Sequence, residues 1–151
     1  MSIVQSSRIS LALRSLTLAL FASSSVSAAE PDILGCWDGE SVVQYLKDGT
    51  SKTQTRNCSF QVVPDRILMR CPTSGRDALV DYSYRITKPG TYVATMVSHS
   101  SRPDLVGATR EYQYRLEGER LFISTNPQTT IPAPPTAAVK VESVSLRVAC
   151  K

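Results

Sequence analysis

Two cysteines placed symmetrically about a turn signal constrain the fold more than any other feature of the chain. Cys58 and Cys71 lie at equal distances from the dipeptide Pro64-Asp65. If that dipeptide forms a two-residue hairpin turn, the cysteines face each other on antiparallel strands. The same register aligns one apolar face of the hairpin, formed by Phe60, Val62, Ile67 and Met69. Because proline suits type I and II turns better than the primed turns of two-residue hairpins, a three-residue loop with the register shifted by one is the alternative.

The other two cysteines lie near the two ends of the sequence beyond residue 30. Four cysteines allow three connectivities, and pairing Cys58 with Cys71 leaves Cys36 with Cys150. That second bridge would join the first predicted strand to the last. A strand meander whose two ends are neighbours is a closed barrel.

The first 29 residues have the composition of a secretory signal peptide. Arg8 and Arg14 precede a short apolar run from Leu16 to Ala22, and small residues follow up to Ala28 and Ala29. We expect cleavage after Ala28 or Ala29, which leaves residues 30–151 as a single domain. The apolar run is shorter than a membrane span requires, and no later run is long enough. Export to an oxidising compartment, the bacterial periplasm or the medium, favours disulfides.

The charge balance excludes some classes of partner. The whole chain has 17 basic and 13 acidic residues, and removal of Arg8 and Arg14 leaves 15 basic residues against the same 13. Because positive and negative charges are nearly equal in number, there is no reason to expect nucleic acid as a partner.

Beyond residue 30, short runs of β-branched and aromatic residues alternate with Gly, Pro, Asp and Asn turn signals. This pattern predicts an all-β, antiparallel up-and-down meander that closes into a roughly eight-stranded barrel. The predicted strands are Gly35 to Leu46, Thr53 to Val63, Arg66 to Cys71, Leu79 to Thr87, Thr91 to Ser98, Thr109 to Glu117, Arg120 to Thr125 and Ala138 to Ala149. Division of the first strand near Gly39 is left open. The segment between Asn126 and Ala138 holds four prolines and is predicted to be a long loop.

Period-two alternation assigns an inward face to several strands. Inward residues in the middle strands are predicted to be Val80, Tyr82, Tyr84, Ile86, Tyr112, Tyr114 and Leu116. In the last strand the apolar residues change phase after Val141, so we predict a bulge near Glu142 and Ser143 that keeps both sets inward. The sequence KPGT, residues 88 to 91, is typical of a type II turn with glycine at the position of positive φ.

The start of the first strand, LGCWDG, resembles the G-x-W sequence that begins the barrel in lipocalins, fatty-acid-binding proteins, avidins and nitrobindin-like domains. The resemblance implies a barrel with a ligand cavity. It also implies that Trp37 closes one end and packs near an arginine of the last strand, for which Arg147 is the candidate. The lipocalin Thr-Asp-Tyr motif and terminal helix are missing. With one tryptophan and one histidine, His99, the chain offers neither the aromatic box of an avidin nor a convincing haem ligand, so no cofactor is expected.

Other readings of single residues are weaker. ILGC around Cys36 is separated from the apolar run by a serine-rich stretch, which disfavours lipidation. The cysteine spacings do not suit zinc, so no metal site is expected. His99 lies among serines with Asp104 nearby, but sequence neighbours seldom form a catalytic triad and no nucleophile motif is present. We therefore expect no enzyme.

Two hypotheses of function remain. In the first, the four inward tyrosines, Tyr82, Tyr84, Tyr112 and Tyr114, line a pocket for a small apolar or amphipathic ligand. The alternative use of these tyrosines is to fill the core of a narrow barrel. In the second hypothesis the protein is a periplasmic protein-binding or inhibitor module. It would act through the proline-rich loop and the loop from His99 to Arg110.

Overall fold

The structure is a computed structural model, and it describes residues 32–54, 58–126 and 138–151. The predicted signal peptide and most of the proline-rich loop lie outside these residues. The described strands are β1 (Gly35–Leu46), β2 (Ser51–Gln54), β3 (Ser59–Val63), β4 (Arg66–Cys71), β5 (Ala78–Lys88), β6 (Thr91–His99), β7 (Thr109–Glu117), β8 (Arg120–Thr125) and β9 (Ala138–Val148). One short 3-10 helix, η1 (Pro103–Leu105), lies between β6 and β7.

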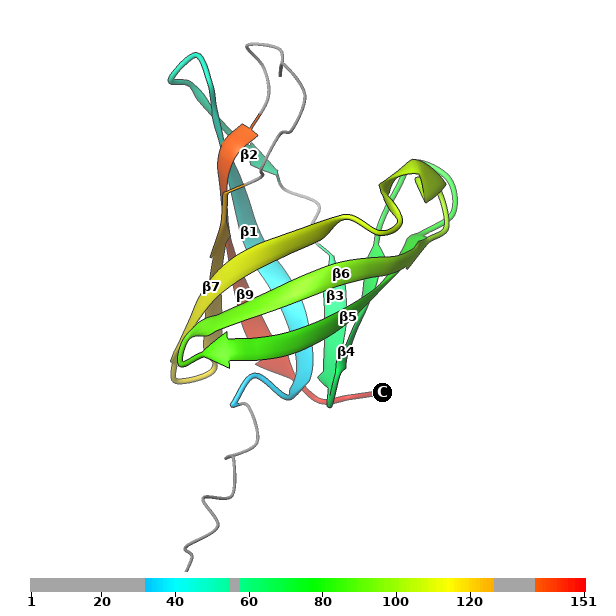
Figure 1. Cartoon of the computed structure of the whole chain (residues 1–151), viewed down its shortest axis with the longest axis vertical. Helices are drawn as coiled ribbons and strands as arrows, with labels where there is room; N and C mark the ends of the chain where they lie inside the picture. Colours follow the sequence, from blue (N-terminus) through cyan, green and yellow to red (C-terminus); the bar gives the residue numbers. More distant parts are fainter. Residues whose placement is uncertain (1–31, 55–57, 127–137) are drawn as a thin grey trace, which may run out of the picture.

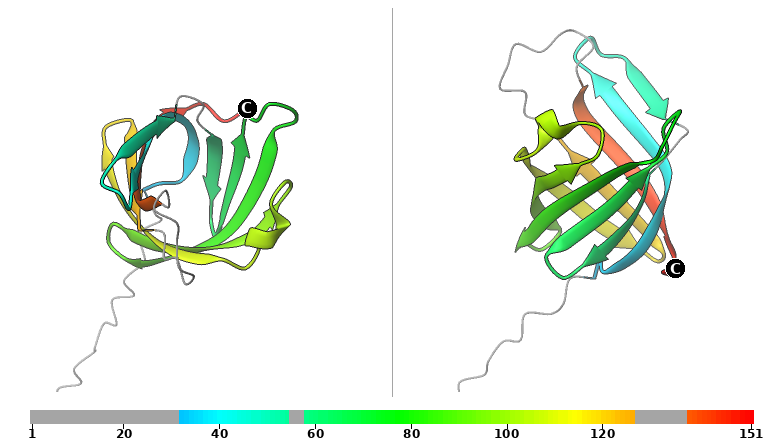
Figure 2. Two further views of the ribbon diagram at one scale, coloured as in Figure 1. Left: turned by 90° about the horizontal axis from the view of Figure 1, so that it is seen from above. Right: turned by 90° about the vertical axis from the view of Figure 1, so that its right-hand side faces the viewer.

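Eight of these strands form a closed antiparallel barrel (Figures 1 and 2). Each strand from β3 to β8 pairs with the next in sequence, as expected of a meander. The barrel closes because β1 pairs with β3 on one side and with β9 on the other, from Cys36 opposite Val148 to Leu46 opposite Ala138. The predicted fold class is confirmed.

The predicted strand from Thr53 to Val63 is wrong in one respect, because the structure contains two strands there. β3 pairs with the first part of β1, from Gly35 to Asp38, whereas β2 pairs with its later part, from Val42 to Tyr45. All four residues of β2 are exposed. With no apolar residue to bury, β2 forms an outer hairpin with β1, and only β3 belongs to the barrel.

Both predicted disulfides are present. β3 and β4 pair in the predicted register, with Phe60 opposite Met69 and Val62 opposite Ile67, and Cys58 is bonded to Cys71. Asp65 has a φ of 67°, so the two-residue turn has its left-handed residue in second place, which is compatible with proline before it. The second disulfide joins Cys36 to Cys150.

The predicted bulge near Glu142 and Ser143 of β9 is wrong. The register of β1 against β9 shifts at two other places, and the shift between Tyr45 and Leu46 makes Val139 of β9 an extra residue. β9 pairs with β8 in constant register from Val141 to Leu146. The register between β1 and β9 shifts between Gly39 and Ser41, which makes Glu40 the extra residue. The inward positions of β9 from Ser143 to Arg147 are therefore polar: Ser145 is buried opposite Leu121, whereas Leu146 is 39% exposed.

The two ends of the barrel differ in their connections. At one end, here called the turn end, lie the short turns of residues 63–66, 88–91 and 117–120 and both ends of the described chain (Figure 1). The opposite end, the loop end, carries the longer connections of residues 72–77 and 100–108. In the turn of residues 88–91, Gly90 has the predicted positive φ, 71°.

Candidate functional site

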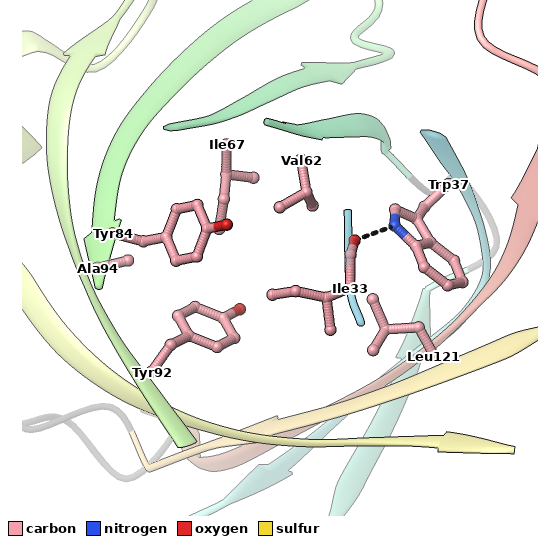
Figure 3. Close-up of a cluster of buried hydrophobic side chains, with 8 residues drawn as sticks. All are labelled: Ile33, Trp37, Val62, Ile67, Tyr84, Tyr92, Ala94 and Leu121. Carbon is pink, nitrogen blue, oxygen red and sulfur yellow. Dashed lines mark hydrogen bonds between the residues drawn. The ribbon is translucent and has the colours of Figure 1, made fainter. Parts of the chain in front are cut away.

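The turn end is closed by a cluster around Trp37. This side chain is fully buried, and its Nε1–H donates a hydrogen bond of 2.9 Å to the carbonyl oxygen of Ile33 (Figure 3). The Arg147 guanidinium lies over the indole ring, 4.2 Å from its centroid. Arg147 also donates hydrogen bonds to the carbonyl oxygens of Leu34 and Asp32, at 2.7 and 3.0 Å. The chain entering β1 is thus fastened across this end, with Arg147 in the position that the resemblance implied.

Gly35 has two reasons to be glycine. Its φ of +127° is a conformation that other residues rarely adopt. A Cβ atom at this position would also lie 2.8 Å from an Nη atom of Arg147. The G-x-W sequence therefore serves the cluster directly: glycine makes room for the arginine, and the arginine covers the tryptophan.

Above this cluster the barrel interior contains a cavity of about 120 Å³. Its lining is mainly apolar and aromatic, from Ile33, Phe60, Val62, Ile67, Met69, Tyr82, Tyr92, Ala94, Tyr112, Leu121, Ile123 and Ser143. Ile33 and Leu121, at the Trp37 end, are each 1% exposed. Phe60, Met69 and Tyr82, farther toward the loop end, are only half-buried. The cavity is therefore closed at the turn end and reaches solvent toward the loop end.

The four predicted pocket tyrosines divide into two groups. Tyr82 and Tyr112 line the cavity. Tyr84 and Tyr114 lie farther along their strands toward the turn end, do not line the cavity, and pack with the hydrophobic core, which Tyr82 and Tyr112 also contact. Ile86 opposes the inward Tyr92 and so keeps the predicted face, but it lies at the turn end of β5 and is 38% exposed. Both uses that the sequence left open, pocket and core, thus occur in one set of side chains.

Sequence reasoning missed Tyr92, which lies at the centre of the tyrosine cluster. Its ring stacks on Tyr112 with centroids 4.9 Å apart and lies 5.9 Å from the rings of both Tyr84 and Tyr114. β6 has apolar residues in both phases, so alternation alone could not choose its inward face. The register with β7, which places Tyr92 opposite Tyr112, would have identified it.

Burial keeps the interior phenols in their neutral form. It raises the pKa of Tyr82 to about 12 and that of Tyr92 well above its ordinary value. The pKa of Tyr112 is also raised by burial, and the neighbouring Arg110 opposes that shift. The hydroxyl of Tyr84 is buried without a hydrogen-bond partner among the described residues. The interior therefore offers neutral hydroxyl groups, which can donate or accept hydrogen bonds, on otherwise apolar walls.

The loop that follows β6 does not assemble a catalytic triad. The Nδ1 atom of His99 accepts hydrogen bonds from the backbone N–H groups of Ser101 and Arg102, at 3.2 and 3.1 Å. Asp104 is paired with Arg102 at 2.7 Å rather than with the histidine. The hydroxyl of Ser101 also lies 3.4 Å from His99 Nδ1, but with Asp104 held by Arg102 the three side chains do not form a Ser-His-Asp relay.

The described residues contain neither a cluster of metal ligands nor a helix that could span a membrane. Within residues 32–54, 58–126 and 138–151, no three His, Cys, Asp or Glu side chains are grouped as a metal site needs. All four cysteines are in disulfides. Over the same part of the chain, no helix has the length and apolar character needed to cross a membrane.

Comparison with known proteins supports the fold and does not assign a function. The barrel is similar to the crystal structure of a lipocalin-like protein from Bacteroides uniformis ATCC 8492, with a TM-score of 0.52 and 12% identity, over 78% of this chain and 100% of that chain. An uncharacterized protein from Bacteroides eggerthii DSM 20697 is similar with a TM-score of 0.50, 12% identity and the same coverage. No protein-family model and no curated protein matches the sequence. The fold is that of a small lipocalin-like barrel.

Proposed function

We propose that this protein is an exported binding protein that holds a small apolar or amphipathic molecule in the cavity of its barrel. The observation that carries the proposal is the apolar cavity of about 120 Å³, closed at the turn end and lined with tyrosines. Lipocalin-like barrels place ligands in this position. The neutral hydroxyls of Tyr82 and Tyr112 supply the few polar contacts that orient a ligand on apolar walls.

The cavity volume limits the size of the ligand. Pockets for drug-sized molecules measure roughly 300 to 1,000 Å³. A cavity of roughly 150 Å³ holds a single benzene molecule. A cavity of about 120 Å³ therefore suits one small ring or a short alkyl chain, and is too small for haem or a long-chain lipid without expansion of the barrel.

We further propose that residues 1–29 direct export and are removed, which leaves residues 30–151 as the functional domain in the periplasm or medium. Two disulfides that tie strands of the barrel support this location, because such bonds persist in oxidising compartments. The mass of the protein recovered after export tests the cleavage site.

Ligand binding can be tested by titration calorimetry with toluene, cyclohexane and benzyl alcohol as probes. Saturable binding of at least one probe is expected, and Ser143→Leu, which fills part of the cavity, should weaken it about tenfold or more. The matched control is Ser124→Leu on the neighbouring strand, because Ser124 lies opposite Glu142, one position out of phase with Ser143, and does not line the cavity. Absence of saturable binding for all three probes, or equal effects of the two variants, would contradict the proposal.

A second candidate function is the binding of another protein through the loop end. Leu79 and Val106 are 52% and 48% exposed, and Leu79 is hydrogen-bonded to Ser100 of the loop after β6. A partner from the periplasm that is retained by the native protein and lost on Leu79→Ser and Val106→Ser would favour this function over the first. Loss of partner binding on Ser143→Leu alone would instead connect it to the cavity.

A further inference from the structure

Arg110 is placed at the rim of the cavity by the register of β6 and β7. In antiparallel strands, residues that oppose each other point to the same face. Arg110 opposes Ala94, which is buried and lines the cavity, and Tyr112 opposes Tyr92, which also lines it. β7 runs from the loop end toward the turn end, so Arg110 lies one inward position nearer the loop end than Tyr112. Its side chain is exposed there.

The charge of Arg110 acts on the hydroxyl groups that line the cavity. It opposes the effect of burial on the pKa of both Tyr112 and Tyr82. The registers agree with this, because Arg110, Tyr112 and Tyr82 oppose neighbouring inward residues of β6, namely Ala94, Tyr92 and Met96. Together these three side chains form a polar rim above an apolar cavity.

Arg110 differs from most arginines of the barrel in its ion pairing. Arg66, Arg102, Arg115 and Arg120 each form an ion pair with a carboxylate of this chain. Among the residues that the structure describes, no carboxylate lies within ion-pair distance of Arg110. The rim thus has an uncompensated positive charge and donors suited to an anion.

We propose that the ligand is a small amphipathic carboxylic acid, whose carboxylate binds to Arg110 and the hydroxyls of Tyr82 and Tyr112 while its apolar part occupies the cavity. This inference rests on the proposed function and narrows it to one ligand class. A guanidinium presents parallel N–H groups that match the two oxygens of a carboxylate. Because the rim is exposed, the carboxylate keeps part of its hydration, which limits the cost of removing it from water.

The test compares three probes that share one ring and differ in charge: benzoate, benzyl alcohol and benzylamine. Titration calorimetry of the oxidised protein at neutral pH should give the order benzoate, benzyl alcohol, benzylamine, with benzoate at least about tenfold tighter than the alcohol. Arg110→Gln should remove that preference and leave benzyl alcohol binding within about twofold. Arg110→Lys should retain part of the preference through its charge. The control is Arg115→Gln on the same strand, because Arg115 pairs with Glu117 and lies over Phe122 on the outer face.

Each outcome separates this inference from the proposed function. Equal binding of benzoate and benzyl alcohol, with no effect of Arg110→Gln, would overturn the carboxylate site and leave the cavity proposal in place. Equal loss of benzoate binding on Arg110→Gln and Arg115→Gln would also overturn it, because the effect would then be one of net charge. Absence of binding by all three probes would contradict the proposed function itself.

Discussion

At the turn end of the barrel, Trp37 is fully buried beneath Arg147, and the chain from Asp32 to Leu34 is hydrogen-bonded to the same arginine. Toward the loop end, the side chains of Tyr82 and Tyr112 remain half-buried around a cavity, and Arg110 is exposed above them. At the turn end the indole N–H of Trp37 and the guanidinium of Arg147 are hydrogen-bonded to backbone carbonyls, whereas Arg110 at the other end has no ion-pair partner among the described residues. The strands of the two ends are similar, so the difference lies in whether polar side chains already have partners within the protein. The end whose polar side chains are paired stabilises the fold, and the end with an unpaired charge can bind a ligand.

The largest expected difference between the two ends concerns their disulfides. Cys36–Cys150 lies near the turn end and spans 114 residues, whereas Cys58–Cys71 lies at the loop end and spans 13. A cross-link stabilises mainly by restricting the unfolded chain, and more so for longer loops. Replacing both members of the first pair by serine should lower the free energy of unfolding by about 5 kcal/mol, and of the second pair by about 3 kcal/mol. Urea unfolding measures both, and equal losses would show that loop length does not govern them.

A smaller effect is expected from Gly35→Ala at the turn end. The substitution strains the backbone and places a methyl group against Arg147, so we expect a loss of about 2 to 3 kcal/mol. The matched control is Gly49→Ala in the hairpin between β1 and β2. Gly49 also has a positive φ, of 84°, but no described atom lies within 4 Å of the added methyl group, so about 1 kcal/mol is expected. If thermal or urea unfolding gives equal losses for the two variants, the contact with Arg147 contributes nothing.

The unpartnered hydroxyl of Tyr84 predicts a gain of stability. Tyr84→Phe removes a buried polar group that lacks a partner among the described residues, so the free energy of unfolding should stay constant or rise by about 1 kcal/mol. Tyr45→Phe is the control, because it removes an exposed hydrogen bond to Glu142 and should lower stability by no more than about 0.5 kcal/mol. A clear loss of stability in Tyr84→Phe would reveal a hydrogen-bond partner for this hydroxyl, such as an internal water.

The smallest effect on stability near neutral pH is expected from ionisation of the interior phenols, which should change the free energy of unfolding only at alkaline pH. The pKa of Tyr82 is raised to about 12 by burial, whereas in the unfolded chain it is about 10. Between these values the unfolded state loses its proton first, so the free energy of unfolding should be constant below pH of about 9 and fall as the pH rises from about 10 to 12. Tyrosinate absorbance, followed together with urea unfolding, measures this. In Tyr82→Phe the fall should be smaller, and an unchanged profile would mean that Tyr82 is not protected by burial.

The sequence predicted the register of one hairpin and the contact at the turn end better than it predicted the cavity. The symmetry of Cys58 and Cys71 about Pro64-Asp65 determined a register, and G-x-W with Arg147 indicated the closing contact, because each feature depends on local geometry or on a specific residue pair. The prediction of one strand from Thr53 to Val63 was wrong. Two strands occur there because β3 pairs with the first half of β1 and β2 with its second half, and no local sequence signal indicates this division.

The sequence by itself determined an antiparallel meander with two disulfides. Turn residues and the alternation of apolar and polar residues are local signals that indicate where strands begin and end, and the cysteine positions fit one register of paired strands. Only the tertiary structure decided which tyrosines line the cavity, where the bulge lies, and that Tyr92 and Arg110 belong with Tyr82 and Tyr112. These features depend on how far each strand is shifted against its neighbours around the closed barrel. A shift of one residue turns a side chain from the interior to the surface, so the composition of the cavity follows from all the registers together.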